Sequence, residues 1–580
     1  MGIKGFGSRM SAYAQRTHLG STSDPARDAV AIVDGPGLAH YVYYGLCGKR
    51  EGSQKPITYT ECAQAALEWL DLTQAIGMKI GAILFDGALP HAKRSVRIGR
   101  LQAYAEKVHV YKQSDKAGML LDGRARKRLP PPPFLVFAVV EELRQSKYGH
   151  VTYVVPGEAD PYCIIAAIQV SDEASETTVT IFSDDSDLLV YNLGQRSVCV
   201  APFRDLDDEQ TISGTTRSAE VYWPTRIAAQ ASVLLEDLVK PAFFMSEDPY
   251  CTFDEALLRI KKKDPSDRED FKAFGRGFQT TEEKTEWLSI TTDSSKKRNL
   301  AACDSRVSEI ICQTQSLRAG SLEGGVKMYL PFLIDDPGRA SAWNVGTNIR
   351  ALAYSLLLRC EGLESEGAQE YRRSGSRITG NLMELISLEE TEEQLRASCA
   401  YFDEFFEWAK GQDLCDADTC RSVVLSQTCQ YAQAGGHSLP GIKEAQQLVQ
   451  GRAEGRLRAW HLVHLSAEYQ AAYYSLRILH QIASHVVAHG SIAKDVASLV
   501  RARLSTLPRI GQFFEESQEQ QSWVRVIPEL MANFEAKDTD EEPVQKKRRK
   551  KTKWTKWEKE GSGQEDASGD NNPFALLMDD

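Results

Sequence analysis

Four short apolar segments, each closed by acidic or turn-forming residues, constrain the fold of this chain more than any other feature. They are rich in Val and Ile, which is typical of strands buried on both faces of a parallel sheet. The segments are DAVAIVDG ending at Gly35, IGAILFDG ending at Gly87, HVTYVVPG ending at Gly157 and TTVTIFSDDSD ending at Asp187. Helical patterns separate them, so the alternation predicts an α/β domain with a mostly parallel central sheet.

Acidic residues stand at the carboxyl end of each predicted strand. In an open α/β sheet these ends face a common crevice where ligands bind. A single strand that ends in Asp-Gly usually marks only a turn, because both residues are favoured there. Four such endings, two of them with paired acids, favour a shared site instead. The acids are Asp34, Asp86, Glu158, Asp160, Asp185 and Asp187.

Six carboxylates in one crevice require a counter-charge, since neighbouring negative charges raise each other's pKa. Hard divalent cations such as Mg²⁺ or Mn²⁺ prefer oxygen ligands and remove this conflict. Two such ions about 4 Å apart stabilise both the attacking and the leaving oxygen when a phosphodiester is hydrolysed. The pattern therefore predicts a hydrolytic site with two Mg²⁺ or Mn²⁺ ions.

Basic residues follow the strand that ends at Asp86. Lys93, Arg97 and Arg100 are spaced i, i+4 and i+7, which places them on one face of a predicted helix. A charged stripe usually faces solvent, but the position of this one beside the acids favours contact with a substrate phosphate. A second basic run, 124–128, is interpreted either as an arm for single-stranded nucleic acid or as an exposed loop.

The overall charge argues against a generally basic nucleic-acid-binding surface. The formal net charge is -11 and the pI is near 5.7, whereas phosphate attraction scales with local positive charge. This argument against nucleic-acid binding is weaker if the negative charge is concentrated in a metal site and in a tail, and if the basic side chains cluster elsewhere. Twelve cysteines without a C-x-x-C pair predict reduced, mostly buried thiols in a cytosolic or nuclear protein. No apolar stretch is long enough for a membrane span, and the start MGIKGFGSRM lacks a secretory signal.

The chain of 580 residues is longer than one hydrophobic core usually serves. We expect an α/β domain over 1–260, a linker or irregular connection over 261–320, a largely α-helical accessory region over 321–535 and a disordered tail over 536–580. The clearest helix covers AWHLVHLSAEYQAAYYSLRILHQIASHVV, where apolar residues recur every three or four positions. The basic run KKRRKK in the tail predicts nuclear localisation, with a non-specific polyanion-binding patch as the alternative.

Several segments resemble, in order, the motifs of the XPG and flap-endonuclease superfamily. They are MGIKGF, IVDG, FDGALPHAKRSVRIGRL, PGEADPY and FSDDSDLL. The segment SDDSDLL and the spacing of FDG-x-LP-x-x-K are closer to the Asteroid branch than to classical flap endonucleases. The resemblance covers roughly residues 1–260 and implies a PIN-like nuclease fold. It implies that one metal is held by Asp34, Asp86, Glu158 and Asp160, and the other by Asp185 and Asp187, with Asp184 behind them. It also implies that Lys93 and Arg100 contact the scissile phosphate.

The chain also departs from the family pattern. Relatives have a further metal-binding Asp in a G-x-D-Y stretch, where this chain has MSEDPYCTFDEAL with Asp248 as the candidate. The glycine-rich hairpin with which relatives grip duplex DNA does not follow. His40 stands at the position of a base-stacking aromatic residue, with tyrosines close by. These differences indicate a different substrate preference.

We therefore expect a structure-specific nuclease that hydrolyses phosphodiester bonds, with DNA rather than RNA as its substrate. The alternative is a scaffold or nucleic-acid-binding protein that keeps the fold without cutting and acts in RNA regulation. The acidic pI and the missing hairpin favour this alternative, whereas the complete set of six acids opposes it. An RNase with the same metal site is a third interpretation. We expect no membrane partner, and a protein partner would bind the C-terminal helical region or the tail.

Overall fold

The computed structural model describes residues 3, 6–20, 29–50, 57–90, 93–116, 129–173, 176–206, 217–281, 284–285, 287, 303–364, 366–435, 437–450, 459–490, 492–515 and 520–535. Two predictions fall outside this part of the chain, namely the basic run 124–128 and the tail 536–580 with its KKRRKK segment. Chain contacts separate a compact unit, Met1–Phe534, from a second unit, Glu535–Asp580. Apart from Glu535, the described residues belong to the compact unit.

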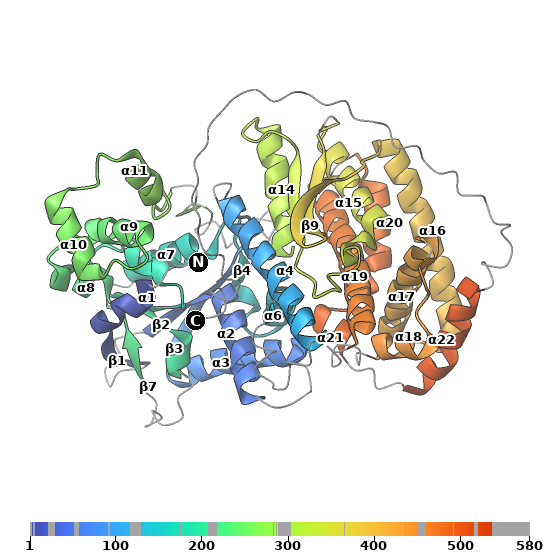
Figure 1. Cartoon of the computed structure of the whole chain (residues 1–580), viewed down its shortest axis with the longest axis horizontal. Helices are drawn as coiled ribbons and strands as arrows, with labels where there is room; N and C mark the ends of the chain where they lie inside the picture. Colours follow the sequence, from blue (N-terminus) through green and yellow to red (C-terminus); the bar gives the residue numbers. More distant parts are fainter. Residues whose placement is uncertain are drawn as a thin grey trace. The chain divides into compact units, whose positions relative to one another are not determined.

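A five-stranded parallel sheet forms the centre of the N-terminal part of this unit (Figure 1). Its strands are β2 (Ala29–Asp34), β3 (Met78–Phe85), β4 (Thr152–Val154), β5 (Thr178–Phe182) and β6 (Val198–Ala201), in the spatial order β4-β3-β2-β5-β6. Every neighbouring pair is parallel. The four predicted strands and the α/β class are confirmed. The apolar run of β6 is too short to be predicted.

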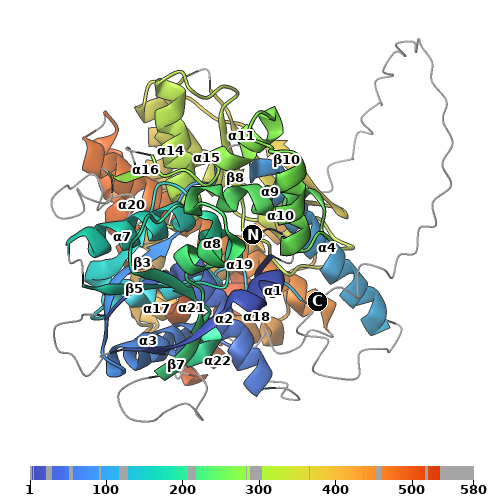
Figure 2. The same ribbon diagram turned by 90° about the vertical axis from the view of Figure 1, so that its left-hand side faces the viewer.

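Helices cover both faces of the sheet, as strands made of continuous apolar residues require. They are α2 (Gly35–Lys49), α3 (Tyr59–Ala75) and α6 (Leu135–Gln145) on one face and α7 (Ala159–Glu173) on the other. In β2, Ala31 and Val33 join the first core, whereas Val30 and Ile32 join the second. Figure 2 shows β3 and β5 between α7 and α3. Alternate residues of one strand thus reach two separate cores.

The remaining elements of the N-terminal part surround this sheet. They are α1 (Phe6–Met10), α4 (Arg94–Lys116), α8 (Pro224–Ala231), α9 (Val239–Glu247), α10 (Phe253–Lys262), α11 (Glu269–Arg276) and the antiparallel pair β1 (Gln15–Leu19) and β7 (Arg217–Val221). A capping box at Thr58 and Glu61 starts α3, because each side chain accepts a hydrogen bond from the other residue's backbone N–H.

Helices dominate the C-terminal part, as the periodicity predicts. They are α14 (Ser305–Arg318), α15 (Thr347–Cys360), α16 (Leu388–Gly411), α17 (Asp416–Ala434), α18 (Ile442–Val449), α19 (Trp460–His489), α20 (Lys494–Arg503), α21 (Ile510–Phe514) and α22 (Gln520–Glu535). The helical periodicity does not predict the small sheet β10-β9-β8 of the same part. Its strands are β8 (Val326–Tyr329), β9 (Ala368–Ser374) and β10 (Arg377–Leu382).

The predicted long helix is confirmed as α19, and it forms the centre of the C-terminal core. Its apolar stripe, which includes Leu462, Tyr469, Leu476 and Val486, is buried. It packs against α15, α17 and α20, and Figure 1 shows these helices around it. A helix of this length that is apolar along much of its surface needs neighbours on several sides.

The N-terminal and C-terminal parts share a core. Phe134, at the start of α6, stacks on Tyr474 of α19 with ring centroids 4.8 Å apart. Arg477 of α19 forms ion pairs with Glu141 of α6 and with Asp304, which precedes α14. Because both parts lie within one compact unit, the boundaries at about residues 260 and 320 stay a prediction.

Two further features of the fold are the state of the cysteines and the hydropathy of the helices. All twelve cysteines are free thiols and most are buried, as expected. None of the helices in the described ranges is both long and apolar enough to span a membrane.

Candidate functional site

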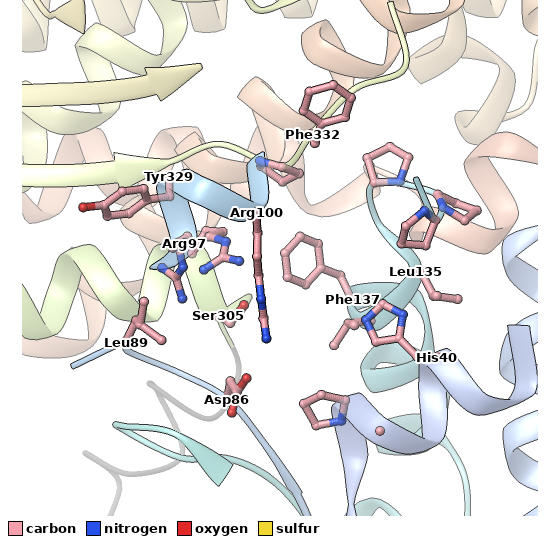
Figure 3. Close-up of a pocket in the computed structure, with 18 of the residues that line it drawn as sticks. His40, Asp86, Leu89, Arg97, Arg100, Leu135, Phe137, Ser305, Tyr329 and Phe332 are labelled. Carbon is pink, nitrogen blue, oxygen red and sulfur yellow. The ribbon is translucent and has the colours of Figure 1, made fainter. Parts of the chain in front are cut away.

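A cavity of about 750 Å³ lies at the carboxyl ends of β2, β3, β4 and β5 (Figure 3). The N-terminal part lines it with the strand ends, α2, α4 and the residues before α6. The C-terminal part contributes Ser305 and Arg306 of α14, Tyr329 at the end of β8 and the following residues 330–332. The cavity therefore belongs to both parts of the protein.

Five of the six predicted metal-binding acids line this cavity. They are Asp34 at the end of β2, Asp86 after β3, Glu158 and Asp160 after β4, and Asp185 after β5. Asp184, the predicted acid behind them, lines it too. Asp187 is not among the lining residues, and its Oδ1 accepts a hydrogen bond from the backbone N–H of Ile3 at 2.7 Å. The parallel sheet thus brings together acids that are far apart in the sequence.

Asp34 is the buried acid of this group, with 7% of its surface exposed. Its Oδ2 accepts a hydrogen bond from Ser183 Oγ at 2.7 Å, and its Oδ1 accepts one from the Gly37 N–H at 3.1 Å. Ser183 Oγ in turn accepts a hydrogen bond from the backbone N–H of Asp185 at 3.0 Å. Burial raises the pKa of Asp34 to about 7, and the charges of Asp86 and Asp185 add to this rise.

The other acids influence one another in the same way. Burial raises the pKa of Asp160 well above its ordinary value, and the charges of Asp34, Asp185 and Asp86 raise it further. Burial and the charge of Asp185 raise the pKa of Asp187 to about 6. No ion pair to Asp34 or Asp160 is found among the described residues. The acids therefore form one electrostatically coupled group that lacks a full counter-charge.

The glycines that follow two of the acids are required by close packing. A Cβ on Gly87 would lie 1.7 Å from the carbonyl oxygen of Val155, and one on Gly35 would lie 2.5 Å from the Phe85 ring. Only a residue without a side chain fits either position. Asp-Gly therefore does more here than make a turn, since it lets neighbouring strands end side by side.

Both predicted phosphate-contacting residues line the cavity, but in different surroundings. Lys93 Nζ pairs with Glu158 Oε1 at 2.8 Å. Burial opposes the charge of Lys93, but Glu158, Asp160 and Asp187 outweigh this effect and raise its pKa. Arg100 extends toward Asp86 in Figure 3, and no ion pair to its guanidinium is found within the described ranges. Arg100 is thus available to a ligand, whereas Lys93 is engaged with an acid.

Arg97, the third member of the predicted basic face, also lines the cavity but contacts the C-terminal part. Its Nη1 lies 2.5 Å from Glu309 Oε2 of α14. Its guanidinium also lies over the ring of Tyr329, 5.2 Å from the centroid. On the predicted basic face, Lys93 therefore contacts an acid of the cavity, whereas Arg97 contacts α14.

His40 and Asp248, at which the chain departs from the family pattern, lie in different places relative to the cavity. His40 lines the cavity and stacks on Tyr44, with ring centroids 6.4 Å apart. Burial, with a smaller effect from Arg100, lowers the pKa of His40 and favours its neutral form. Asp248 is not among the lining residues and pairs with Arg259 at 2.7 Å. The structure does not bring this acid to the cavity.

The donor set fits a hard divalent cation by its chemistry. It consists mainly of carboxylate oxygens, and the buried Asp34 has no ion pair within the described ranges. In the same part of the chain, no group of three or more His, Cys, Asp or Glu is already arranged to hold a metal ion. Carboxylates without an intervening cation repel one another. Closure around an ion would therefore require these side chains to move inward.

Comparison with known proteins finds two similarities. Residues 131–385 match the family model described as XPG domain containing. Over 210 residues the chain is 24% identical to Asteroid homolog 1 of Schizosaccharomyces pombe. Both similarities agree with the motifs in the sequence, which resemble the Asteroid branch of the XPG family. The similarity to the yeast protein covers 36% of this chain and 34% of that protein, so it spans about a third of the relative's length.

The range that matches the family model includes cavity residues that the sequence motifs do not indicate. Arg306, Tyr329 and Phe332 line the cavity from the C-terminal part, and they lie within the matched range 131–385. None of them stands in a recognisable motif or next to a strand-end acid. The tertiary contact between α4 and α14 is the reason they reach the site.

Proposed function

We propose that this protein is a metal-dependent, structure-specific nuclease that hydrolyses phosphodiester bonds in DNA. One observation carries the proposal, which is that acids from four strand ends share one cavity with Lys93 and Arg100. The XPG-type domain supports the same class of reaction. Two bound Mg²⁺ or Mn²⁺ ions would lower the pKa of the attacking water and neutralise charge on the leaving oxygen.

The acids would divide between the two ions as the family resemblance implies. Asp34, Asp86, Glu158 and Asp160 would hold one ion, and Asp185 and Asp187 would hold the other. Backbone N–H groups already orient several of these carboxylates. Asp86 Oδ1 accepts a hydrogen bond from the Ala159 N–H at 2.7 Å, as Asp187 does from Ile3. Such contacts fix a ligand's direction before it binds.

Lys93 and Arg100 would act on the substrate phosphate. Arg100 presents a planar fork of donors that matches phosphate oxygens. Lys93 would exchange Glu158 for a phosphate oxygen when Glu158 turns toward an ion. The two cations would then hold the ester in place and stabilise the negative charge that develops on it.

A second candidate function is nucleic-acid binding without cleavage, as a scaffold in RNA regulation. The Lys93–Glu158 ion pair favours it, because this contact neutralises a metal-binding acid with a phosphate-binding base. The uncompensated charge at Asp34 and Asp160 opposes it. A protein that binds no metal gains nothing from keeping such acids together.

Cleavage assays with the full-length protein test the proposal. Labelled flap, bubble, single-stranded DNA and RNA substrates are incubated with Mg²⁺, Mn²⁺ or a chelator. We expect metal-dependent cleavage of DNA and a loss of at least about a hundredfold in Asp86→Asn, since an asparagine is a poor ligand for a hard cation.

Asp248→Asn is the matched control. It removes an acid that the sequence suggests as a seventh ligand but that pairs with Arg259 away from the cavity, so cleavage should be unchanged. Absence of cleavage on every substrate, with the wild type equal to Asp86→Asn, would leave the binding function. Cleavage confined to RNA would keep the nuclease and replace its substrate.

A further inference from the structure

Two guanidiniums share a single carboxylate where α4 meets α14 at the cavity wall. Arg97 Nη1 lies 2.5 Å and Arg306 Nη1 lies 3.3 Å from the same Oε2 atom of Glu309. The side chains of Glu309, Arg97 and Arg306 are 4%, 13% and 24% exposed. One buried negative charge therefore faces two positive charges, and the cluster keeps an excess of positive charge in a partly desolvated place.

Hydrogen-bond donors in this cluster also exceed acceptors. Each guanidinium carries five N–H donors, and Glu309 Oε2 accepts one from each arginine. The Nε of Arg306 is buried and has no hydrogen-bond partner in the described part of the chain. Burial and the charge of Arg306 lower the pKa of Arg97 to about 10. A buried donor without an acceptor is costly, so the cluster favours an anion that would complete it.

The cluster lies next to the acids. The charge of Asp86 acts on Arg97, and a Cβ on Gly87 would lie 3.2 Å from Ser308 Oγ. The first turn of α14 is therefore packed against the loop that carries Asp86. Figure 3 shows Arg97, Arg100 and Ser305 on the same side of the cavity as Asp86. An anion bound by Arg97 and Arg306 would be close to the proposed metal ions.

We propose that Arg97 and Arg306 form a phosphate subsite for the substrate strand, separate from the scissile phosphate held by Lys93 and Arg100. The subsite binds a neighbouring backbone phosphate, and the inference rests on the proposed nuclease function. Arginine suits this role because its planar donors match two phosphate oxygens at once. The C-terminal part thus contributes directly to substrate binding through α14, and Arg306 sets the position of the strand relative to the acids.

Binding measured without metal separates this inference from cleavage. A short labelled single strand, of DNA or of RNA, is titrated with the full-length protein in chelator at several salt concentrations. We expect Arg306→Gln to weaken binding about tenfold and to reduce the slope of log affinity against log salt by roughly one contact. Arg306→Lys keeps the charge and should retain the slope while losing part of the affinity.

Arg318→Gln is the matched control, because Arg318 lies on the same helix but is 60% exposed and pairs with Glu361. It should change neither affinity nor slope. Thermal melting of each variant shows whether folding is intact. If Arg306→Gln does not fold, the loss of affinity in Arg306→Lys is the test, and wild-type affinity in that variant would overturn the subsite.

Several outcomes would overturn the subsite. They are wild-type affinity and slope in Arg306→Gln, an equal loss in Arg318→Gln, or no binding of either strand by the wild type. Inorganic phosphate that displaces the strand at equal concentration would indicate a site for free anions instead. If binding depends on Arg306 but no substrate is cleaved with Mn²⁺, the nuclease proposal fails, whereas the contact of Arg306 with a backbone phosphate is retained.

Discussion

The cavity at the strand ends and the core of the C-terminal part both enclose charged groups, but they satisfy them differently. In the C-terminal core, Arg350 and Glu370 are both 0% exposed and are joined by two hydrogen bonds, of 2.5 and 3.0 Å. The other hydrogen bonds of Arg350 reach Ser475 Oγ, Thr347 Oγ1 and backbone carbonyls. In the cavity, Asp34 and Asp160 have hydrogen bonds or charged neighbours but no ion pair among the described residues.

This difference indicates what each set of charges is for. A buried charge that is fully paired and hydrogen-bonded stabilises one particular arrangement of the chain. A group of like charges that lacks a full counter-charge is a net cost to the folded state, and such groups cluster at functional sites. The contrast can be tested by removing charges from one part and then from the other.

The largest effect is expected from breaking the paired set. Arg350→Met leaves Glu370 buried without a cation, and we expect the free energy of unfolding to fall by about 3–5 kcal/mol. Urea unfolding followed by circular dichroism measures it. The double variant Arg350→Met, Glu370→Leu should be less destabilised than the single one, because it leaves no lone buried charge. Equal losses in both would contradict the role of pairing.

His485, on α19, is an exception within the C-terminal core. Burial and the charge of His489 lower its pKa to about 4, and its Nδ1 has no hydrogen-bond partner among the described residues. The unfolded chain binds this proton below the ordinary histidine pKa of about 6.5, whereas the folded chain does so only near 4. The free energy of unfolding should therefore fall as the pH drops through this window, by about 2 kcal/mol near pH 5.

His485→Leu should remove this part of the pH dependence. The measurement is urea unfolding at about pH 7 and about pH 5, and the quantity compared is the difference between the two, not the absolute stability. A variant with the same pH dependence as the wild type would show that another group is responsible.

Removing a charge from the cavity should have the opposite sign. Asp34→Asn eliminates a buried negative charge without an ion pair, so the metal-free protein should be as stable as the wild type or more stable, by about 1 kcal/mol. The same variant should lose metal-dependent cleavage. Differential scanning calorimetry in chelator gives the stability. A loss of several kcal/mol would mean that Asp34 serves the fold through Ser183 and Gly37.

The smallest effect is expected from a pair that is neither buried nor part of a site. Lys410 and Glu407 form an exposed ion pair on α16, with side chains 69% and 72% exposed. Lys410→Gln should change the free energy of unfolding by less than about 0.5 kcal/mol. The measurement is the same urea titration. A larger change would show that exposure does not separate the two kinds of charge in this protein.

The sequence predicts an element of the fold best where the composition and period of one continuous segment are enough to identify it. The strands β2, β3 and β5 and the helix α19 are each continuous and strongly apolar, so their burial follows from composition and period. The strand β6 and the sheet of β8, β9 and β10 do not follow, because short segments are stabilised by partners far along the chain. The boundaries between the parts also depend on contacts such as Arg477 with Glu141.

The acids Asp34, Asp86, Glu158, Asp160 and Asp185 can be predicted to meet from the sequence alone, since parallel strands must end at the same edge of a sheet. Arg97 and Arg306 cannot. By its spacing, Arg97 lies on the same helix face as Lys93 and Arg100. In the folded chain it pairs with Glu309 of α14, and this partner is known only from the packing of α14 against α4. Backbone geometry is shared by all parallel sheets and can be anticipated, whereas side-chain partners across a long sequence separation depend on the complete folded chain.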